Sequence, residues 1–205
     1  KVQAVDIPKE IIIVNDCSTD KTKEILDTLG QENSIKIVHH SVNSGKGAAI
    51  QTAKDYITGD LVIIQDADLE YEPDEYLALY NLFLEKNADA VYGSRYSGNQ
   101  VMIDTFVHYY GNKVITFISN IFSNLHLTDM ETCYKMIRSD IFKKIEIESN
   151  CFGFEPEITA KLAKMKVRIF EVPIHYEPRT EGKKIGWKDG FKAVWLIIKF
   201  NLLKR

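Results

Sequence analysis

Cysteine is scarce in this sequence of 205 residues, and its distribution limits where the protein works. The three cysteines, Cys17, Cys133 and Cys151, are odd in number, and no two of them have CxxC spacing. Disulfide frameworks of oxidising compartments usually show an even number of cysteines at regular spacings. A reducing compartment is therefore the expected setting, and we predict a cytoplasmic location.

A strong excess of one charge and a long apolar run are also missing. Lys and Arg number 26 and Asp and Glu number 29, which gives a net charge of -3. This balance argues against a nucleic-acid partner, which usually requires a basic surface. No apolar run approaches the ~20 residues of a membrane-spanning helix. Hydrophobic residues still make up 45% of the chain, which is enough for a sizeable core and excludes a disordered chain.

Two common catalytic motifs are absent as well. The histidines show no HExxH or other clustered spacing, so we predict no zinc site. No GxSxG motif marks a nucleophilic serine. The chemistry must therefore come from other residues.

The first hundred residues alternate short β-branched runs with helical patterns. Strands are predicted at 10–15, 34–39, 60–65 and 89–93, and helices at 20–29, 45–57 and 73–86. Runs that are apolar at every position are typical of strands covered on both faces by crossover helices. The pattern predicts an α/β fold with a mostly parallel central sheet flanked by helices.

After residue 100 the pattern becomes α+β. Strands are predicted at 132–137 and 168–172, and helices at 104–124, 156–166 and 187–203. No linker separates the two parts, so we expect residues 1–205 to form one domain with two subregions, 1–98 and 99–205.

Two of the predicted helices have an apolar row. The row of the 104–124 helix consists of Phe106, Tyr110, Val114, Phe117 and Ile121. The row of the last helix consists of Trp187, Phe191, Val194, Trp195, Ile198 and Leu202, and Lys188, Lys192 and Lys199 lie beside it. This last helix fits a membrane interface and equally fits packing on the core, so both interpretations stay open.

Acidic side chains follow the predicted strands. In parallel sheets, ligands bind outside the carboxyl ends of the strands. Asp66 and Asp68 come directly after the 60–65 strand, and alternation along an extended segment points both carboxylates the same way. Two such carboxylates predict a Mg²⁺ or Mn²⁺ site completed by phosphate oxygens. A solvated turn is the alternative.

Polar residues also stand at other strand ends and helix starts. Asp16 ends the first strand, where a carboxylate can accept hydrogen bonds from a base or ribose, whereas Asp20 is better explained as a helix cap. Lys46 lies between two glycines at a helix start; the glycines permit a close approach of the backbone to a phosphate, and the lysine is a candidate diphosphate contact. A plain helix-opening turn is the alternative. Arg95 follows the 89–93 strand and is either a phosphate ligand or the partner of a nearby acid.

Three further segments carry charges, and two of them have two interpretations. An acid in 127–135 is either a general base or a turn cap. Glu155 precedes a proline and is expected to be extended. The basic loop 179–184 is either a lid that closes over a diphosphate or a solvated linker.

Several motifs together match a known family. The matching segments are EIIIVNDCSTD, NSGKGAAI, DLVIIQDADLEYEP, ADAVYGSRY, LTDMETCYK, GFEPEITAKLAK and RTEGKKIGWKDG. They stand in the family's order and span nearly the whole chain. With them the sequence resembles family 2 glycosyltransferases with the GT-A fold, especially the dolichol-phosphate mannosyltransferase-like branch.

The resemblance implies a nucleotide-diphosphate sugar as donor, bound by residues 1–98, and an acceptor bound by residues 99–205. It implies a metal site of Asp66, Asp68 and Glu70. It implies nucleotide-sugar contacts from a wider set: Asp16, Lys46, Asp66, Arg179, Lys183 and Lys184. It implies catalytic roles for Asp68, Arg95 and Asp129.

The chain departs from the family pattern at three residues and at its start. Asn15 replaces a common Asp, and Cys17 and Cys133 stand where relatives often carry glycine. Family members begin with a strand of the type VIPAYNE and a helix, whereas this sequence begins at Lys1, so the resemblance implies that the first strand is missing.

The expected reaction is inverting transfer to a polyprenyl or dolichyl phosphate, with peripheral contact to the cytoplasmic membrane face. Such an acceptor is already an anion and needs only positive charge, which Arg95 supplies. A saccharide hydroxyl as acceptor would need a base, with Asp129 or Glu131 as the candidate. A sugar nucleotidyltransferase and a non-catalytic sugar-nucleotide-binding module are the remaining alternatives.

Overall fold

The computed structural model describes residues 1–32, 35–98, 105–151, 153–178 and 187–203. The strands in these ranges are β1 (Ile12–Asn15), β2 (Lys36–His39), β3 (Leu61–Ile63), β4 (Ala90–Ser94), β5 (Lys135–Arg138) and β6 (Ile169–Pro173). The helices are α1 (Thr22–Glu32), α2 (Lys46–Lys54), α3 (Tyr76–Lys86), α4 (Phe106–Ser123), α5 (Ser139–Phe142), α6 (Phe154–Lys164) and α7 (Trp187–Ile198). Short helical turns complete them: η1 (Val2–Ala4), η2 (Pro73–Glu75) and η3 (Lys199–Leu203).

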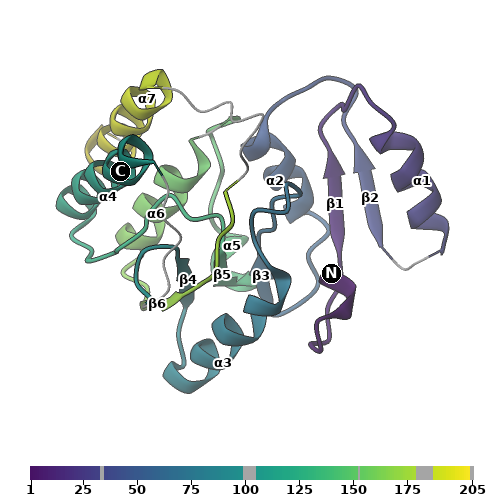
Figure 1. Cartoon of the computed structure of the whole chain (residues 1–205), viewed down its shortest axis with the longest axis horizontal. Helices are drawn as coiled ribbons and strands as arrows, with labels where there is room; N and C mark the ends of the chain where they lie inside the picture. Colours follow the sequence, from purple (N-terminus) through teal and green to yellow (C-terminus); the bar gives the residue numbers. More distant parts are fainter. Residues whose placement is uncertain (33–34, 99–104, 152, 179–186, 204–205) are drawn as a thin grey trace.

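The described strands form two sheets that lie next to each other (Figure 1). β1 and β2 pair in parallel, and the larger sheet has the order β3-β5-β4-β6. β4 and β6 are parallel, but β5 is antiparallel to both β3 and β4. The predicted α/β class is confirmed, while the sheet is less parallel than expected because the chain enters β5 from the edge where β4 ends. The amino end of β5 therefore lies beside the carboxyl ends of β3 and β4.

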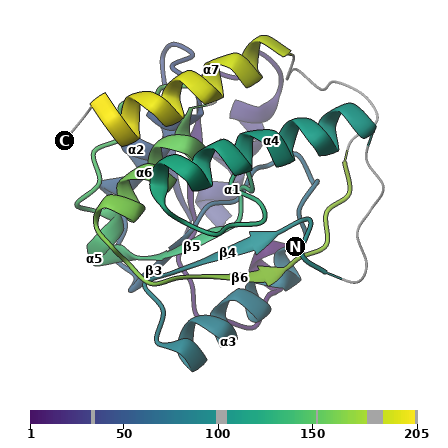
Figure 2. The ribbon, with the colours of Figure 1, turned by 90° about the vertical axis from the view of Figure 1, so that its left-hand side faces the viewer.

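Helices cover both faces of the larger sheet (Figure 2). Ala90 and Tyr92 point to the face covered by α4, α6 and α7, where they join a cluster with Ile158 and Ile197. Val91 points to the other face and packs among side chains of α3. This alternation of side chains along β4 is the usual strand period of two. Because strands from residues 1–98 and 99–205 share the sheet, the two halves share one core.

The predicted elements are found, with shifts at their ends. The strand expected at 132–137 begins only at Lys135, because the residues before it turn along the edge of the sheet. The helix expected from Pro156 begins at Phe154 and holds the proline in its first turn, where its missing N–H has no helical partner to lose. Glu155 is therefore helical, and the expectation of an extended residue was wrong. The short α5 was not predicted.

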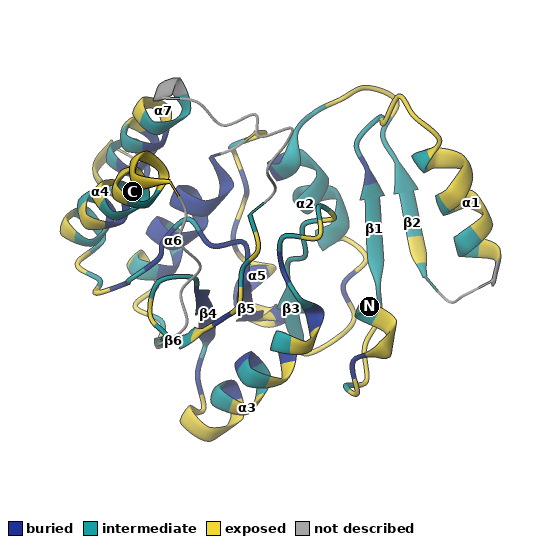
Figure 3. Ribbon diagram, viewed as in Figure 1, coloured by how far each residue is buried: buried dark blue, intermediate teal, exposed yellow. Residues whose placement is uncertain are grey.

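Exposed residues lie along α4 and α7 (Figure 3), and they include most of the described members of the two apolar rows. On α4, Phe106 and Phe117 are 74% and 65% exposed, and the rest of the predicted row is exposed too. On α7, Phe191 and Trp195 are exposed, whereas the opposite face, which includes Ile197, is buried. The last helix therefore packs on the core with one face and presents a second apolar face. No helix in the described ranges is long and apolar enough to cross a membrane.

Candidate functional site

Asp16, directly after β1, organises the loop that starts α2. Its Oδ1 accepts hydrogen bonds from His40 Nδ1 at 2.7 Å and from the Ser44 amide at 2.8 Å, and its Oδ2 accepts from the Gly45 amide at 2.6 Å. Partial burial acts to raise the pKa of Asp16, but these hydrogen bonds outweigh it and lower that pKa. Asp16 is therefore an ionised acceptor at the predicted ligand edge.

The residue before it, Asn15, has a defined role in this chain. Its Oδ1 accepts from the amide and the hydroxyl of Ser18, and its Nδ2 donates to His39 Nδ1. An aspartate could not make this donation, because an ionised carboxylate only accepts. Cys17 adopts a left-handed φ of 58°, a conformation that glycine takes more easily.

The glycines beside Lys46 serve the protein's own packing. The amide of Gly47 donates to the Asn150 carbonyl at 2.8 Å, and a Cβ on Gly47 would lie 1.6 Å from the Ser149 carbonyl oxygen. Gly45 has a φ of 92°, and a Cβ there would lie 2.2 Å from the same Asn150 oxygen. The close approach predicted for a phosphate is thus made by the 149–150 backbone.

Lys46 joins the acidic strand end to α6. Its Nζ lies 2.9 Å from the Asp66 carboxylate and 2.7 Å from Glu155 Oε1. Burial acts to lower the pKa of Lys46, but the charges of Glu155 and Asp66 raise it well above its ordinary value. Burial acts to raise the pKa of Glu155, and Lys46 and Lys135 lower it. Lys46 and Glu155 therefore form a charged pair that also contacts Asp66.

Asp68 and Glu70 diverge after β3. Asp68 Oδ1 accepts the Glu70 amide at 3.2 Å, whereas the Glu70 carboxylate accepts the Tyr176 hydroxyl at 2.9 Å. Among the residues that the structure describes, no three His, Cys, Asp or Glu side chains are gathered as metal ligands. The predicted trio of Asp66, Asp68 and Glu70 does not form, because Glu70 is turned toward Tyr176. Asp66 and Asp68 remain as candidate ligands.

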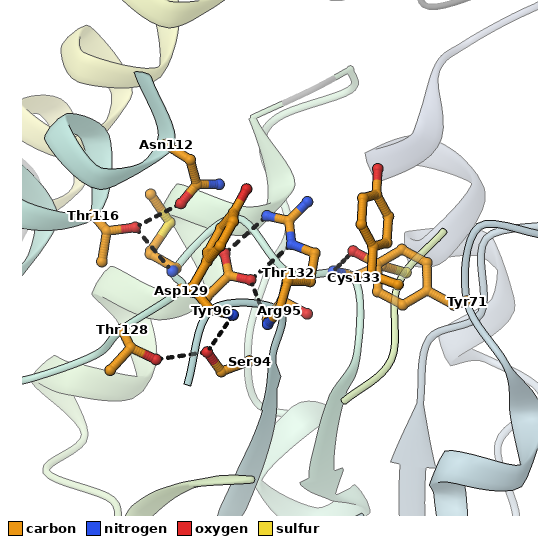
Figure 4. A network of polar contacts seen from close by, with 12 residues as sticks. Tyr71, Ser94, Arg95, Tyr96, Asn112, Thr116, Thr128, Asp129, Thr132 and Cys133 are labelled. Carbon is orange, nitrogen blue, oxygen red and sulfur yellow. Dashed lines mark hydrogen bonds and ion pairs between the residues drawn. The ribbon is translucent and has the colours of Figure 1, made fainter. Parts of the chain in front are cut away.

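Arg95 and Asp129 form a buried ion pair between β4 and the loop before β5 (Figure 4). Arg95 donates from Nε at 2.7 Å and from its terminal nitrogen at 2.8 Å, and its amide also donates to Asp129 at 3.0 Å. The guanidinium lies over the rings of Tyr96 and Tyr176. Arg95 is therefore the partner of a nearby acid, which is one of the two roles expected for it.

This pairing weakens the case for Asp129 as a general base. Asp129 has no exposed surface, and its pKa is lowered because the Arg95 charge and hydrogen bonds outweigh the effect of burial. Glu171 of β6 fixes the same loop by accepting the amides of Thr128 and Asp129. Asp129 is therefore a fixed, ionised partner that orients Arg95.

Glu131, the other candidate base, has a different environment. Its Oε1 is buried and has no hydrogen-bond partner within the described residues. Burial and the neighbouring Glu155 raise its pKa to about 7, although Lys135 and Arg95 act to lower it. A carboxyl group of this kind titrates near neutral pH, as general acids and bases do.

Two residues of this site were not predicted. Lys135, the first residue of β5, is fully buried and donates to the carbonyls of Met130 and Thr132. Glu155 receives Lys46 at the amino terminus of α6. For Lys135, the signal in the sequence was a lysine at the start of an otherwise apolar strand. The predicted loop residues Arg179, Lys183 and Lys184 lie outside the described residues.

Comparison with known proteins identifies the family. The model for "Glycosyl transferase family 2" matches residues 3–146. An undecaprenyl-phosphate mannosyltransferase of Micrococcus luteus is 29% identical over 96% of this chain and 84% of that protein. A dolichyl-phosphate beta-glucosyltransferase of Trichomonas vaginalis is 28% identical over 96% of this chain, which spans 62% of that protein. A hexosyltransferase of low-salt glycan biosynthesis from Haloferax volcanii is 27% identical, and this chain spans 44% of it.

Solved structures show the same fold. Glucosyl-3-phosphoglycerate synthase of Mycobacterium tuberculosis, solved with Mn²⁺, UDP-glucose and phosphoglyceric acid, matches with a TM-score of 0.66 and 12% identity. The match covers 94% of this chain and 68% of that one. The expected GT-A fold is confirmed by this likeness. The family model covers well over half of the sequence, and this chain belongs to glycosyl transferase family 2.

Proposed function

We propose that this protein transfers a sugar, with inversion, from a nucleotide-diphosphate sugar to a polyprenyl or dolichyl phosphate. The observation that carries the choice of acceptor is the position of Arg95. This arginine is fixed by Asp129 beside α4, whose Lys113 lies over Tyr96, the same ring that Arg95 approaches. The outward row of α4 is apolar. Two cationic side chains beside an apolar helix suit an acceptor with a phosphate head and a hydrocarbon chain. Two relatives are named for transfer to such lipids.

The donor's diphosphate fits the edge at β3. Asp66 and Asp68 offer hard oxygen ligands, which suit Mg²⁺ or Mn²⁺, and the side chain of Asp66 is 31% exposed. When bound there, a divalent cation would neutralise the charge that grows on the leaving diphosphate. Lys46 holds Asp66 in place, because its ammonium group contacts both Asp66 and Glu155. Asp16 supplies an ionised acceptor for the nucleoside. Arg179, Lys183 and Lys184 are proposed to add positive charge beside the diphosphate.

A lipid phosphate needs no proton acceptor, and Arg95 needs only to hold and orient it. The phosphate oxygen attacks the anomeric carbon, the bond from that carbon to the donor's diphosphate breaks, and the nucleoside diphosphate leaves with the electron pair. A saccharide hydroxyl is the second candidate acceptor. It is favoured by Glu131, whose Oε1 has no hydrogen-bond partner in the described parts of the chain, because this carboxyl group can accept the proton that a hydroxyl must lose.

Product analysis tests the proposal on the full-length protein. UDP-sugars and GDP-sugars are supplied with Mn²⁺ and either undecaprenyl phosphate or a soluble saccharide. We expect release of UDP or GDP that depends on the lipid phosphate, with a glycosylated lipid as the second product. Release that depends only on the saccharide would favour the second candidate. Release of pyrophosphate would contradict both.

The outward rows of α4 and α7 are proposed to bind a membrane surface at the cytoplasmic face. Burying an exposed Phe or Trp in an apolar environment contributes roughly 2 kcal/mol. Phe117→Ser together with Trp195→Ser should therefore weaken co-sedimentation with anionic vesicles by tenfold or more. Leu84→Ser is the matched control, because Leu84 is similarly exposed but lies on α3. An equal loss in the control, or no loss in the double variant, would contradict the proposed surface.

A further inference from the structure

Glu131 lies at the centre of the site, between the residues proposed for the donor and for the acceptor. In the order β3-β5-β4, the loop before β5 separates Asp66, after β3, from Arg95, after β4. The loop contacts both sides: Asp129 holds Arg95, and the thiol of Cys133 faces Asp66. Glu131 is midway along the loop between these two contacts.

The charged neighbours of Glu131 already have hydrogen-bond partners of their own. Asp66 and Glu155 share Lys46, Asp129 holds Arg95, and the ammonium group of Lys135 donates to backbone carbonyls. Glu131 Oε1 is shut off from solvent without a hydrogen-bond partner in the described part of the chain. A buried carboxyl oxygen in this state costs free energy, and native proteins rarely keep one without a use.

The residue as a whole is not closed off. Glu131 is partly exposed, unlike Asp129 and Thr132 on either side of it in the same loop, which are fully buried. The loop is therefore open to a ligand at Glu131 and closed at Asp129 and Thr132. The groups that face it are Glu155, Lys135, Arg95 and Asp129, so both signs of charge surround it. Such a setting suits a neutral, hydroxyl-bearing group better than a phosphate.

We propose that Glu131 binds a hydroxyl group of the transferred sugar. The inference rests on the proposed function, because the diphosphate at Asp66 and Asp68 and the acceptor phosphate at Arg95 leave the sugar between them. The sugar hydroxyl would satisfy the unpartnered oxygen. Because its pKa is about 7, the Glu131 carboxyl group can donate or accept a hydrogen bond near neutral pH. A sugar hydroxyl can also donate or accept one.

The test measures how much the sugar adds to donor binding. Dissociation constants of UDP, UDP-glucose, GDP and GDP-mannose are measured with Mn²⁺ by calorimetry on full-length wild type, Glu131→Gln and Glu131→Ala. We expect Glu131→Ala to weaken binding of the preferred nucleotide sugar tenfold or more, and to change binding of the matching nucleoside diphosphate less than twofold. Glu131→Gln should lose less, because its amide still forms hydrogen bonds. Glu85→Gln, at an exposed glutamate of α3, should change neither.

The unfolding temperature of the Glu131 variants separates a sugar-binding role of Glu131 from a structural one. Because Glu131 Oε1 has no hydrogen-bond partner to lose among the described residues, Glu131→Gln without ligand should unfold at the same temperature as wild type or higher. A marked fall in unfolding temperature would overturn the proposal in favour of a structural role. Lost turnover with unchanged donor binding would overturn it in favour of a general base.

The outcomes also separate this proposal from the function on which it rests. If wild type binds a nucleotide sugar and the Glu131 variants bind it equally well, only the role of Glu131 is overturned. If wild type binds none of the nucleotide sugars, the proposed function fails and the role of Glu131 fails with it.

Discussion

Replacing Asp129 by asparagine should destabilise the protein and disable it through Arg95, not through the loss of a base. Asp129 has no exposed surface and accepts three hydrogen bonds from Arg95, which is itself almost buried. Breaking a buried ion pair from one side costs about 3–5 kcal/mol, because the remaining charge stays buried without a partner. For a chain of this length, that corresponds to a fall in unfolding temperature of roughly 6–20 °C.

Urea denaturation at pH 7, followed by circular dichroism, measures this loss. Asp140→Asn is the matched control, because Asp140 pairs with Arg138 through the same kind of contact, Nε to Oδ1 at 2.9 Å, but on the surface. We expect no measurable change in that control. If Asp129→Asn unfolds within about 1 kcal/mol of wild type, the interpretation of the pair as a buried anchor is refuted. If it also keeps its fold and loses only turnover, Asp129 is the base after all.

The dependence of this loss on pH follows from the direction of the pKa shift. The pKa of Asp129 is lowered in the folded state, because the effect of Arg95 exceeds that of burial. The stabilisation is therefore present above the ordinary pKa of 3.8 and is lost as the pH falls through the folded value. The difference between wild type and Asp129→Asn should be full at pH 6–8, roughly, and should shrink only below about pH 4.

Other substitutions test the remaining contacts. Lys46→Met leaves the buried Glu155 without its partner and should lower the free energy of unfolding by about 3 kcal/mol, measured by urea denaturation. Gly47→Ala should cost about 3 kcal/mol or more, because its Cβ would overlap the Ser149 carbonyl, whereas Gly111→Ala has open space within α4 and should stabilise by about 0.5–1 kcal/mol. Because the pKa of Glu131 is raised to about 7, its ionisation costs stability as the pH rises from 4.5 to 7. Glu131→Gln should therefore unfold like wild type at pH 4.5 and at a higher temperature at pH 8, as scanning calorimetry can show.

Much of the fold could be predicted from local patterns. The apolar runs of β1, β2 and β4 and the helical periods of α1 to α4 are each contained within a short segment of sequence. The direction of β5 could not be predicted, because its pairing partners lie over forty residues away and its sequence is compatible with either direction. The helical state of Glu155 was missed for a related reason, since the restriction before proline is relaxed within the first turn of a helix.

The candidate site was predicted in part. Asp16, Asp66 and Asp68 follow strands at the expected edge, and their identity as acids was visible in the sequence. Which carboxylates are paired was not visible, because Lys46 reaches Glu155 across 109 positions and Arg95 reaches Asp129 across 34. This pairing fixes Asp129 against Arg95 and leaves Glu131 Oε1 without a hydrogen-bond partner among the described residues.

The antiparallel β5 explains why these charges meet at all. In a purely parallel sheet, the loop before a strand would lie at the far edge from the loops that follow its neighbours. Here the residues before β5 lie between the ends of β3 and β4, so Asp129 and Glu131 come within reach of Arg95 on one side and of the Asp66 loop on the other. The amino terminus of α6 closes the arrangement, because its partial positive charge favours Glu155 in the ionised form that holds Lys46. A change at Glu155 should therefore reach Asp66 through Lys46.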